Sequence, residues 1–128
     1  MRAYLPISHK DLAAFVLSKS IDADQVFAPT TTFVAENLDC DEEELEYLLS
    51  VAAGEAAFDL RLSEKAPGIV VAFEVTDDQI AESYEDSVTL KTALPWNQVQ
   101  CALLAFQGED ELVWFATQEI EIHMSEWK

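Results

Sequence analysis

The sequence predicts an α+β fold, in which a mixed, mostly antiparallel sheet carries one long helix and one or two short helices packed on it. Three observations support this. Residues 69–75 form an almost unbroken β-branched and apolar run, which is typical of a buried central strand. Residues 41–64 carry apolar side chains at helical spacing. The last three predicted strands follow one another through short connections, which favours antiparallel neighbours.

The N-terminal third is predicted to hold a strand, a short helix and a second strand. Apolar and polar side chains alternate over residues 2–7, and Pro6 places this strand at a sheet edge or marks the strand's end. Ser8 begins an N-cap pattern for an amphipathic helix over 9–19. The threonine-rich segment 30–36 predicts a further strand.

The clearest predicted element is the long helix. Asp41 and Glu44 have the spacing of a capping box, so the helix should begin there. It should run to about Glu64, because Ala66, Pro67 and Gly68 follow and end it. Its apolar arc is wide enough to predict packing on two sides.

The second half of the chain is predicted to add one short helix and three strands to the central strand. Thr76 and Gln79 have capping-box spacing, which predicts a helix to about Tyr84. The strands are predicted at 87–92, 99–106 and 111–120, and a turn at 107–110 joins the last two. A helix is the competing interpretation for 111–120.

The composition predicts one acidic domain spanning residues 1–128. The chain has 7 basic and 25 acidic side chains, a net charge of −18, and the charge is spread evenly over both halves. Such a surface repels phosphate backbones and anionic lipid, so neither nucleic acid nor a membrane is expected as a partner. It would attract a cationic protein partner. The simpler interpretation is that the charge serves solubility or reflects the host's proteins in general.

The sequence favours a cytoplasmic location. Cys40 and Cys101 form no CxxC pair and no zinc-ligand spacing. The N-terminus lacks the apolar stretch of a signal peptide, and no apolar run is long enough to span a bilayer. We therefore expect reduced thiols, and the sequence implies no cofactor.

No motif defines a reaction. The chain has no GxSxG motif and no glycine-rich phosphate loop, and its two histidines lie at opposite ends. The cluster of Trp96, Trp114 and Phe115 is interpreted as core, and Trp127 as exposed or facing a partner.

Two groups of carboxylates need a closer check. In a strand, Glu119, Glu121 and His123 would project from one face, as a candidate ligand set for a divalent metal; a solvated face is the alternative. Glu55 and Asp59 are four residues apart on the apolar arc of the long helix. If they were buried, one carboxyl would have a raised pKa; a solvent gap between two buried flanks is the alternative.

Three short motifs carry a resemblance: MRAYLP at the start, EELEY at 43–47 and WFATQE at 114–119. The chain resembles a family of short actinobacterial proteins of unknown function that begin MRxYLP and end near WYxxQE. Phe115 stands where that family usually has tyrosine. The resemblance implies a bacterial, cytoplasmic protein and implies no activity.

Two functional hypotheses follow. The first is a non-enzymatic interaction or regulatory domain that uses its acidic surface. The second is a small enzyme or ligand-binding protein, with a site formed by the N- and C-terminal strands. Its candidate binding residues are Arg2, Tyr4, Trp114, Gln118 and Glu119. If the two terminal strands pair, Arg2 could reach Glu119.

Overall fold

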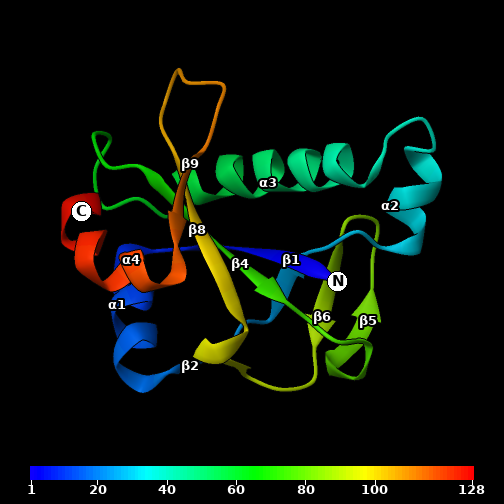
Figure 1. Ribbon diagram of the computed structural model, residues 1–128, viewed down its shortest axis with the longest axis horizontal. Helices are drawn as coiled ribbons and strands as arrows, with labels where there is room; N and C mark the ends of the chain where they lie inside the picture. Colours follow the sequence, from blue (N-terminus) through cyan, green and yellow to red (C-terminus); the bar gives the residue numbers. More distant parts are fainter.

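The computed structural model describes residues 1–128 and is built around a seven-stranded sheet (Figure 1). The strand order is β5-β6-β3-β1-β4-β8-β9, and every pairing is antiparallel, which confirms the predicted fold class. A separate two-stranded sheet pairs β2 with β7. The strands are β1 (Arg2–Ile7), β2 (Ser20–Ile21), β3 (Gln25–Phe27), β4 (Gly68–Glu74), β5 (Ile80–Ser83), β6 (Ser87–Leu90), β7 (Leu94–Pro95), β8 (Val99–Ala105) and β9 (Val113–Ala116).

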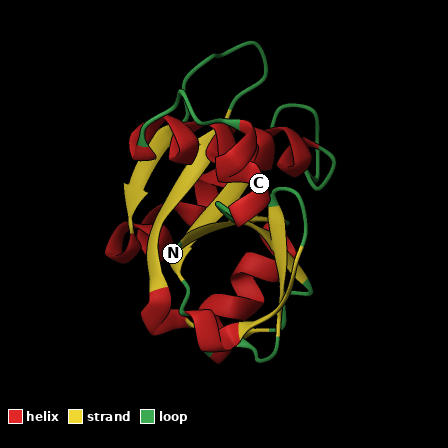
Figure 2. Ribbon diagram, turned by 90° about the vertical axis from the view of Figure 1, so that its right-hand side faces the viewer, coloured by secondary structure: helices red, strands yellow, loops and turns green.

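Helices cover both faces of the main sheet (Figure 2). They are α1 (His9–Ser18), α2 (Thr31–Glu36), α3 (Glu42–Phe58) and α4 (Thr117–His123), with short 3₁₀ helices η1 (Asp77–Gln79), η2 (Trp96–Gln98) and η3 (Met124–Trp127). On one face, α3 packs on alternate residues of β1, β4 and β8. On the other face, α1, α4 and η3 pack on the intervening residues, where the larger part of the core lies.

The first strand, β1, lies inside the sheet, between β3 and β4, so the edge position suggested by Pro6 is wrong. The pairing with β4 runs the full length of β1, whereas β3 meets it only at Tyr4. Pro6 lies near the strand's end, beyond the reach of β3. The missing N–H of proline therefore costs the sheet little at this place.

The segment 30–36 forms helix α2 and not the predicted strand. Thr30 decides this locally, since its Oγ1 accepts a hydrogen bond from the Phe33 backbone N–H and caps the helix. The same hydroxyl donates to the Glu85 carbonyl and is buried. Threonine favours strands on average, but as an N-cap it begins a helix.

The long helix begins as predicted but ends earlier. The capping box of Asp41 and Glu44 is present, and the helix stops at Phe58 and not near Glu64. After it, Arg61 donates from Nε to the Phe58 carbonyl (3.0 Å) and so satisfies a group left free by the helix end. The predicted two-sided packing is wrong, because Tyr47 is 53% exposed on the face away from the sheet.

The middle of the chain contains more strand than predicted. The capping box at Thr76 is present, but it opens only the 3₁₀ helix η1, and β5 replaces the rest of the predicted helix. The short strands β2 and β3 were not predicted. Each has too few residues to show an alternating pattern.

The C-terminal segment 111–120 divides into strand and helix. Strand β9 ends at Ala116, and α4 begins at Thr117, so the predicted strand is wrong for its second half. Trp127 is buried against Phe115, contrary to the expected exposure, whereas Trp114 is 57% exposed and is not core.

None of the helices combines the length and apolar character needed to cross a membrane.

Candidate functional site

The two terminal strands are not neighbours, because β4 and β8 lie between β1 and β9. The premise of a site formed by their direct pairing is therefore wrong. Arg2 forms no ion pair with Glu119. Instead, Oε1 of Glu119 accepts a hydrogen bond from the Ala116 backbone N–H (2.9 Å) and stabilises the start of α4.

Arg2 nevertheless reaches across the sheet to the middle of β8. The register aligns Tyr4 with Ala72 and Ala72 with Cys101. Because Ala72 has only a methyl side chain, Arg2 can pass over β4 and donate from Nη2 to Cys101 Sγ (3.1 Å). Its guanidinium carbon lies 5.9 Å from the centre of the Tyr4 ring. Trp114, on β9, lies beside the same thiol and lowers its pKa.

This Arg2 cluster (Arg2, Tyr4, Cys101 and Trp114) consists mainly of hydrogen-bond donors. Burial raises the pKa of Tyr4 to about 12, so its hydroxyl keeps its proton. Burial also raises the pKa of Cys101, with Arg2 and Trp114 acting in the opposite direction, so the thiol is not activated as a nucleophile. Nε of Arg2 is buried and has no hydrogen-bond partner.

The remaining predicted site residues lie on α4 and not in this cluster. Gln118 is exposed, and Ile120 of the same helix packs in the core on the opposite face of the sheet. Because residues 117–123 are helical, Glu119, Glu121 and His123 do not share the strand face that suggested a metal site. No group of three such side chains is close enough to hold a metal ion. His123 pairs instead with Glu126, at 3.0 Å.

Glu55 and Asp59 are both exposed. The buried alternative is therefore wrong for this pair. The carboxylates are solvated as the other alternative expected, but the second buried flank is absent, because no second layer covers this helix face.

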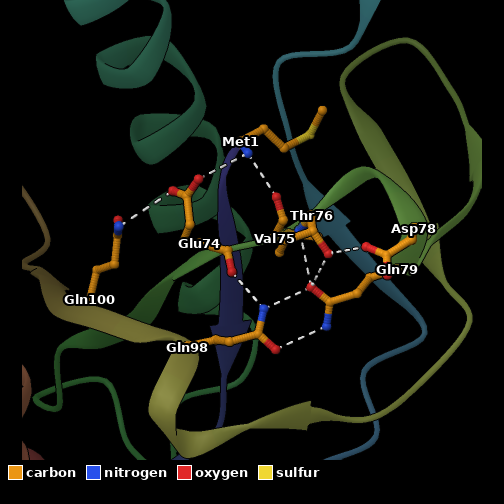
Figure 3. Close-up of polar contacts among 8 residues, drawn as sticks. All are labelled: Met1, Glu74, Val75, Thr76, Asp78, Gln79, Gln98 and Gln100. Atoms are coloured by element: carbon orange, nitrogen blue, oxygen red, sulfur yellow. Dashed lines mark hydrogen bonds and ion pairs between the residues drawn. The ribbon is translucent and has the colours of Figure 1, made fainter.

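A second polar cluster lies where β4 meets η1 and η2 (Figure 3). Gln79 and Gln98 donate to each other's side-chain oxygens, at 2.9 and 2.7 Å. Gln98 also donates to the Glu74 carbonyl (2.7 Å), and Gln79 accepts from the Thr76 backbone N–H (3.0 Å). These bonds attach the loop after β4 to the start of β8.

The open hollow beside this cluster has a volume of about 630 Å³, and Val99 is its one apolar lining residue. The amides of Gln79 and Gln98 are already occupied by each other and by the backbone. Small-molecule sites are mostly apolar with a few free polar groups. The cluster is therefore better explained as a structural connection than as a binding site.

The third feature is a pair of hollows along the outer side of α3. One, of about 350 Å³, lies at the start of the helix, and the other, of about 460 Å³, lies between the helix and the loop after β8. Tyr47 lines both and so lies between them, and we name the two hollows together the acidic groove. That loop projects past α3 (Figure 1). Six carboxylates line the groove, three in each hollow: Asp41, Glu43, Glu44, Glu55, Glu109 and Asp110.

The acidic groove also carries exposed apolar side chains and no basic one. Tyr47 is 53% exposed and Leu48 is 40% exposed. Both belong to the apolar arc that predicted two-sided packing. The sequence thus identified residues that a second layer could cover, but the chain itself supplies no such layer.

Comparison with known proteins gives a family without an assigned activity. The family model of DUF6912, a family of unknown function, matches residues 1–107. The match runs from β1 to just past the end of β8 and leaves β9 and α4 outside. No curated protein and no solved structure matches the chain. These findings confirm the expected membership of a family of unknown function: the chain belongs to the DUF6912 family.

Proposed function

We propose that this protein is a non-enzymatic interaction domain that binds a basic protein segment in the acidic groove. The observation that carries the proposal is the composition of the groove: six carboxylates and exposed apolar side chains, with no lysine or arginine among the lining residues. Solubility alone explains the charge but gives no reason for apolar side chains to be exposed between the carboxylates.

The groove suits a segment in which apolar side chains alternate with lysine or arginine. Apolar contacts with Tyr47 and Leu48 would supply affinity, and the surrounding carboxylates would speed association and select the partner by charge. Nucleic acid and anionic lipid have the wrong charge for this surface. We place the encounter in the cytoplasm, because both cysteines are free thiols.

Neutralising the groove should weaken binding of a basic probe peptide more than neutralising another surface. The test variant is Glu55→Gln/Glu109→Gln/Asp110→Asn, and the matched control is Asp22→Asn/Asp24→Asn/Glu85→Gln. All six positions are exposed, and both variants remove three charges. We expect about ten-fold weaker binding for the test variant and little change for the control, measured by fluorescence anisotropy at low salt.

A peptide of alternating lysine and valine serves as the probe, and its glutamate-for-lysine counterpart should not bind. Tyr47→Ala should weaken binding even at high salt, because it removes an apolar contact and not a charge. If the two triple variants lose the same amount of peptide affinity, binding depends on the overall charge, and this would contradict a localised site. Absence of binding at low salt would also reject the proposal.

A second candidate function is the binding of a small carboxylate at the Arg2 cluster, as the hypothesis of a ligand-binding protein suggests. It is favoured by one observation, the buried Nε of Arg2 without a partner. Such an orphan donor is rare in folded proteins, and a carboxylate would satisfy it through a two-pronged contact. Tyr4 and Trp114 are the other binding residues in this proposal.

The Nε–H resonance of Arg2 tests this candidate directly. Acetate should shift the resonance relative to chloride at equal ionic strength. Arg2→Lys removes the Nε–H donor, so the resonance should disappear in that variant, which identifies it as that of Arg2. An identical resonance in acetate and chloride would reject the candidate.

A further inference from the structure

The two edges of the main sheet differ in how well they are protected from pairing. At one edge, β5 is exposed but interrupted by a register shift between Ile80 and Glu82, and it carries a carboxylate at Glu82. Bulges and charges of this kind discourage another strand from pairing. At the other edge, β9 pairs with β8 without a shift, from Val113 to Ala116.

The open part of β9 is centred on Trp114. Val113 is 44% exposed and Trp114 57%. The N–H of Ala116 bonds to Glu119 and not to β8, so it points to the free edge of the strand. Because backbone groups alternate between the two edges in an antiparallel pair, the N–H and C=O of Trp114 also point to the free edge. No side chain caps the Trp114 groups, whereas Glu119 caps Ala116.

Hollows of different chemistry flank this edge on opposite faces of the sheet. On the α3 face, Leu112 lines the acidic groove together with Glu109 and Asp110. On the other face, Val113 and Phe115 line a hollow of about 350 Å³ whose lining is mostly apolar but also includes Lys65, Glu126 and Lys128. Side chains of an added strand would alternate between the two faces. One set would therefore meet carboxylates and the other set apolar side chains.

We propose that the partner binds as an extra strand on β9, with lysine or arginine facing the acidic groove and apolar residues facing the opposite hollow. This inference rests on the proposed function and specifies how the basic segment binds. Strand addition draws affinity from main-chain hydrogen bonds and specificity from alternate side-chain pockets. A second copy of this chain is disfavoured as the occupant, because each copy carries a charge of −18.

Antiparallel addition makes a definite prediction about the backbone of the probe. The peptide residue directly opposite Trp114 has its side chain on the same face of the sheet as Trp114, which is the face of the acidic groove, so this residue is a lysine. Its backbone N–H and C=O exchange hydrogen bonds with those of Trp114. N-methylation of the lysine residues in the alternating lysine–valine peptide should therefore abolish binding, measured by fluorescence anisotropy. N-methylation of the valine residues, the matched control with the same charge and mass, should leave binding nearly unchanged.

Each outcome separates this inference from the proposed function. If both N-methylated peptides bind like the parent, strand addition is wrong while the basic groove partner remains supported. If only the peptide with N-methylated valines loses binding, the antiparallel alignment is wrong. In a parallel pair, Trp114 would bond to the residues on either side of the one opposite it, and these are the valines. If the unmethylated peptide fails to bind at low salt, the proposed function fails as well.

Two variants of the protein complete the test. Trp114→Lys places a charge on the open edge and should reduce peptide binding at least ten-fold, since edge lysines repel an added basic strand. Ser83→Lys makes the same charge change on the β5 edge and should have little effect; both positions are exposed, so folding is retained. If the protein dimerises in sedimentation experiments and Trp114→Lys abolishes the dimer, the occupant is a second copy and the inference is overturned.

Discussion

At the scale of single residues, small side chains decide what the Arg2 cluster can be. Ala72 lies between Tyr4 and Cys101 in the register, and its methyl group leaves the path across β4 open for Arg2. A leucine at residue 72 would block that path. The cluster therefore depends on four strands at once (β1, β4, β8 and β9), although each of its residues is unremarkable in its own strand.

Tyr4 provides a prediction for alkaline pH. Its pKa is raised from 10.0 to about 12 in the folded protein, mainly by burial, so the folded state holds this proton more tightly than the unfolded state. The contribution of the protonated Tyr4 phenol to the stability of the folded state is complete below pH 10 and is lost as the pH rises from 10 to 12. The free energy of unfolding should fall over this range, and it should fall less in Tyr4→Phe.

Denaturant unfolding of both proteins at several alkaline pH values measures the difference. An absorbance titration of tyrosinate in the two proteins isolates the Tyr4 contribution as their difference. This difference should appear near pH 12. A difference that appears near pH 10 would contradict the buried, protonated phenol.

At the scale of elements, the contact between α3 and the sheet depends on close approach at glycine. A Cβ added to Gly68 would lie 3.0 Å from the Ala57 Cβ and 3.3 Å from the helix backbone. A Cβ added to Gly54 would lie 3.3 Å from Ala105 and from a side-chain methyl of Leu112. The first contact is against rigid backbone, whereas the second includes a side chain that can move.

Gly68→Ala should therefore destabilise the protein by about 1–3 kcal/mol, because the helix must move away from β4. Gly54→Ala is the control at the same interface. The gain in helix propensity, about 1 kcal/mol, offsets its milder crowding, so we expect a change close to zero. Urea unfolding of both variants tests this. If Gly68→Ala is as stable as the parent, helix α3 can move away from Gly68 at little cost, and the prediction is wrong.

At the scale of the whole molecule, the net charge of −18 opposes compaction. The Met1 amine and Glu74 form an ion pair, and His123 contacts Glu126 at 3.0 Å, but no lysine or arginine side chain pairs with a carboxylate. Most of the 25 acidic side chains are therefore solvated, and folding depends on the apolar core on the two faces of the sheet.

Salt should stabilise the protein by screening this repulsion. Raising sodium chloride from about 20 mM to about 500 mM shortens the Debye length from roughly 20 Å to roughly 4 Å. We expect Tm to rise by roughly 3–5 °C, equivalent to about 1 kcal/mol in a domain of this size. The triple variant Asp22→Asn/Asp24→Asn/Glu85→Gln should show a smaller rise. A Tm that falls with salt would mean that attractive ion pairs dominate.

Patterns within short segments predicted much of this fold. The central strand β4, the N-cap at Ser8 and the capping box of α3 follow from neighbouring side chains, and all three are present. The wrong predictions concern segments whose residues are compatible with either a strand or a helix. Thr30 has a β-branched side chain but caps α2, and the segment after Ala116 changes from strand to helix once Glu119 bonds back to the backbone.

The sequence by itself determined the α+β class, the even acidity and most of the regular elements, because these depend on composition and on contacts within a few residues. Only the tertiary structure decided that β4 and β8 separate the terminal strands, that Arg2 still reaches Cys101, and that no layer covers Tyr47. Strand order depends on pairings between distant segments, and an apolar helix face looks the same in sequence whether this chain or a partner covers it.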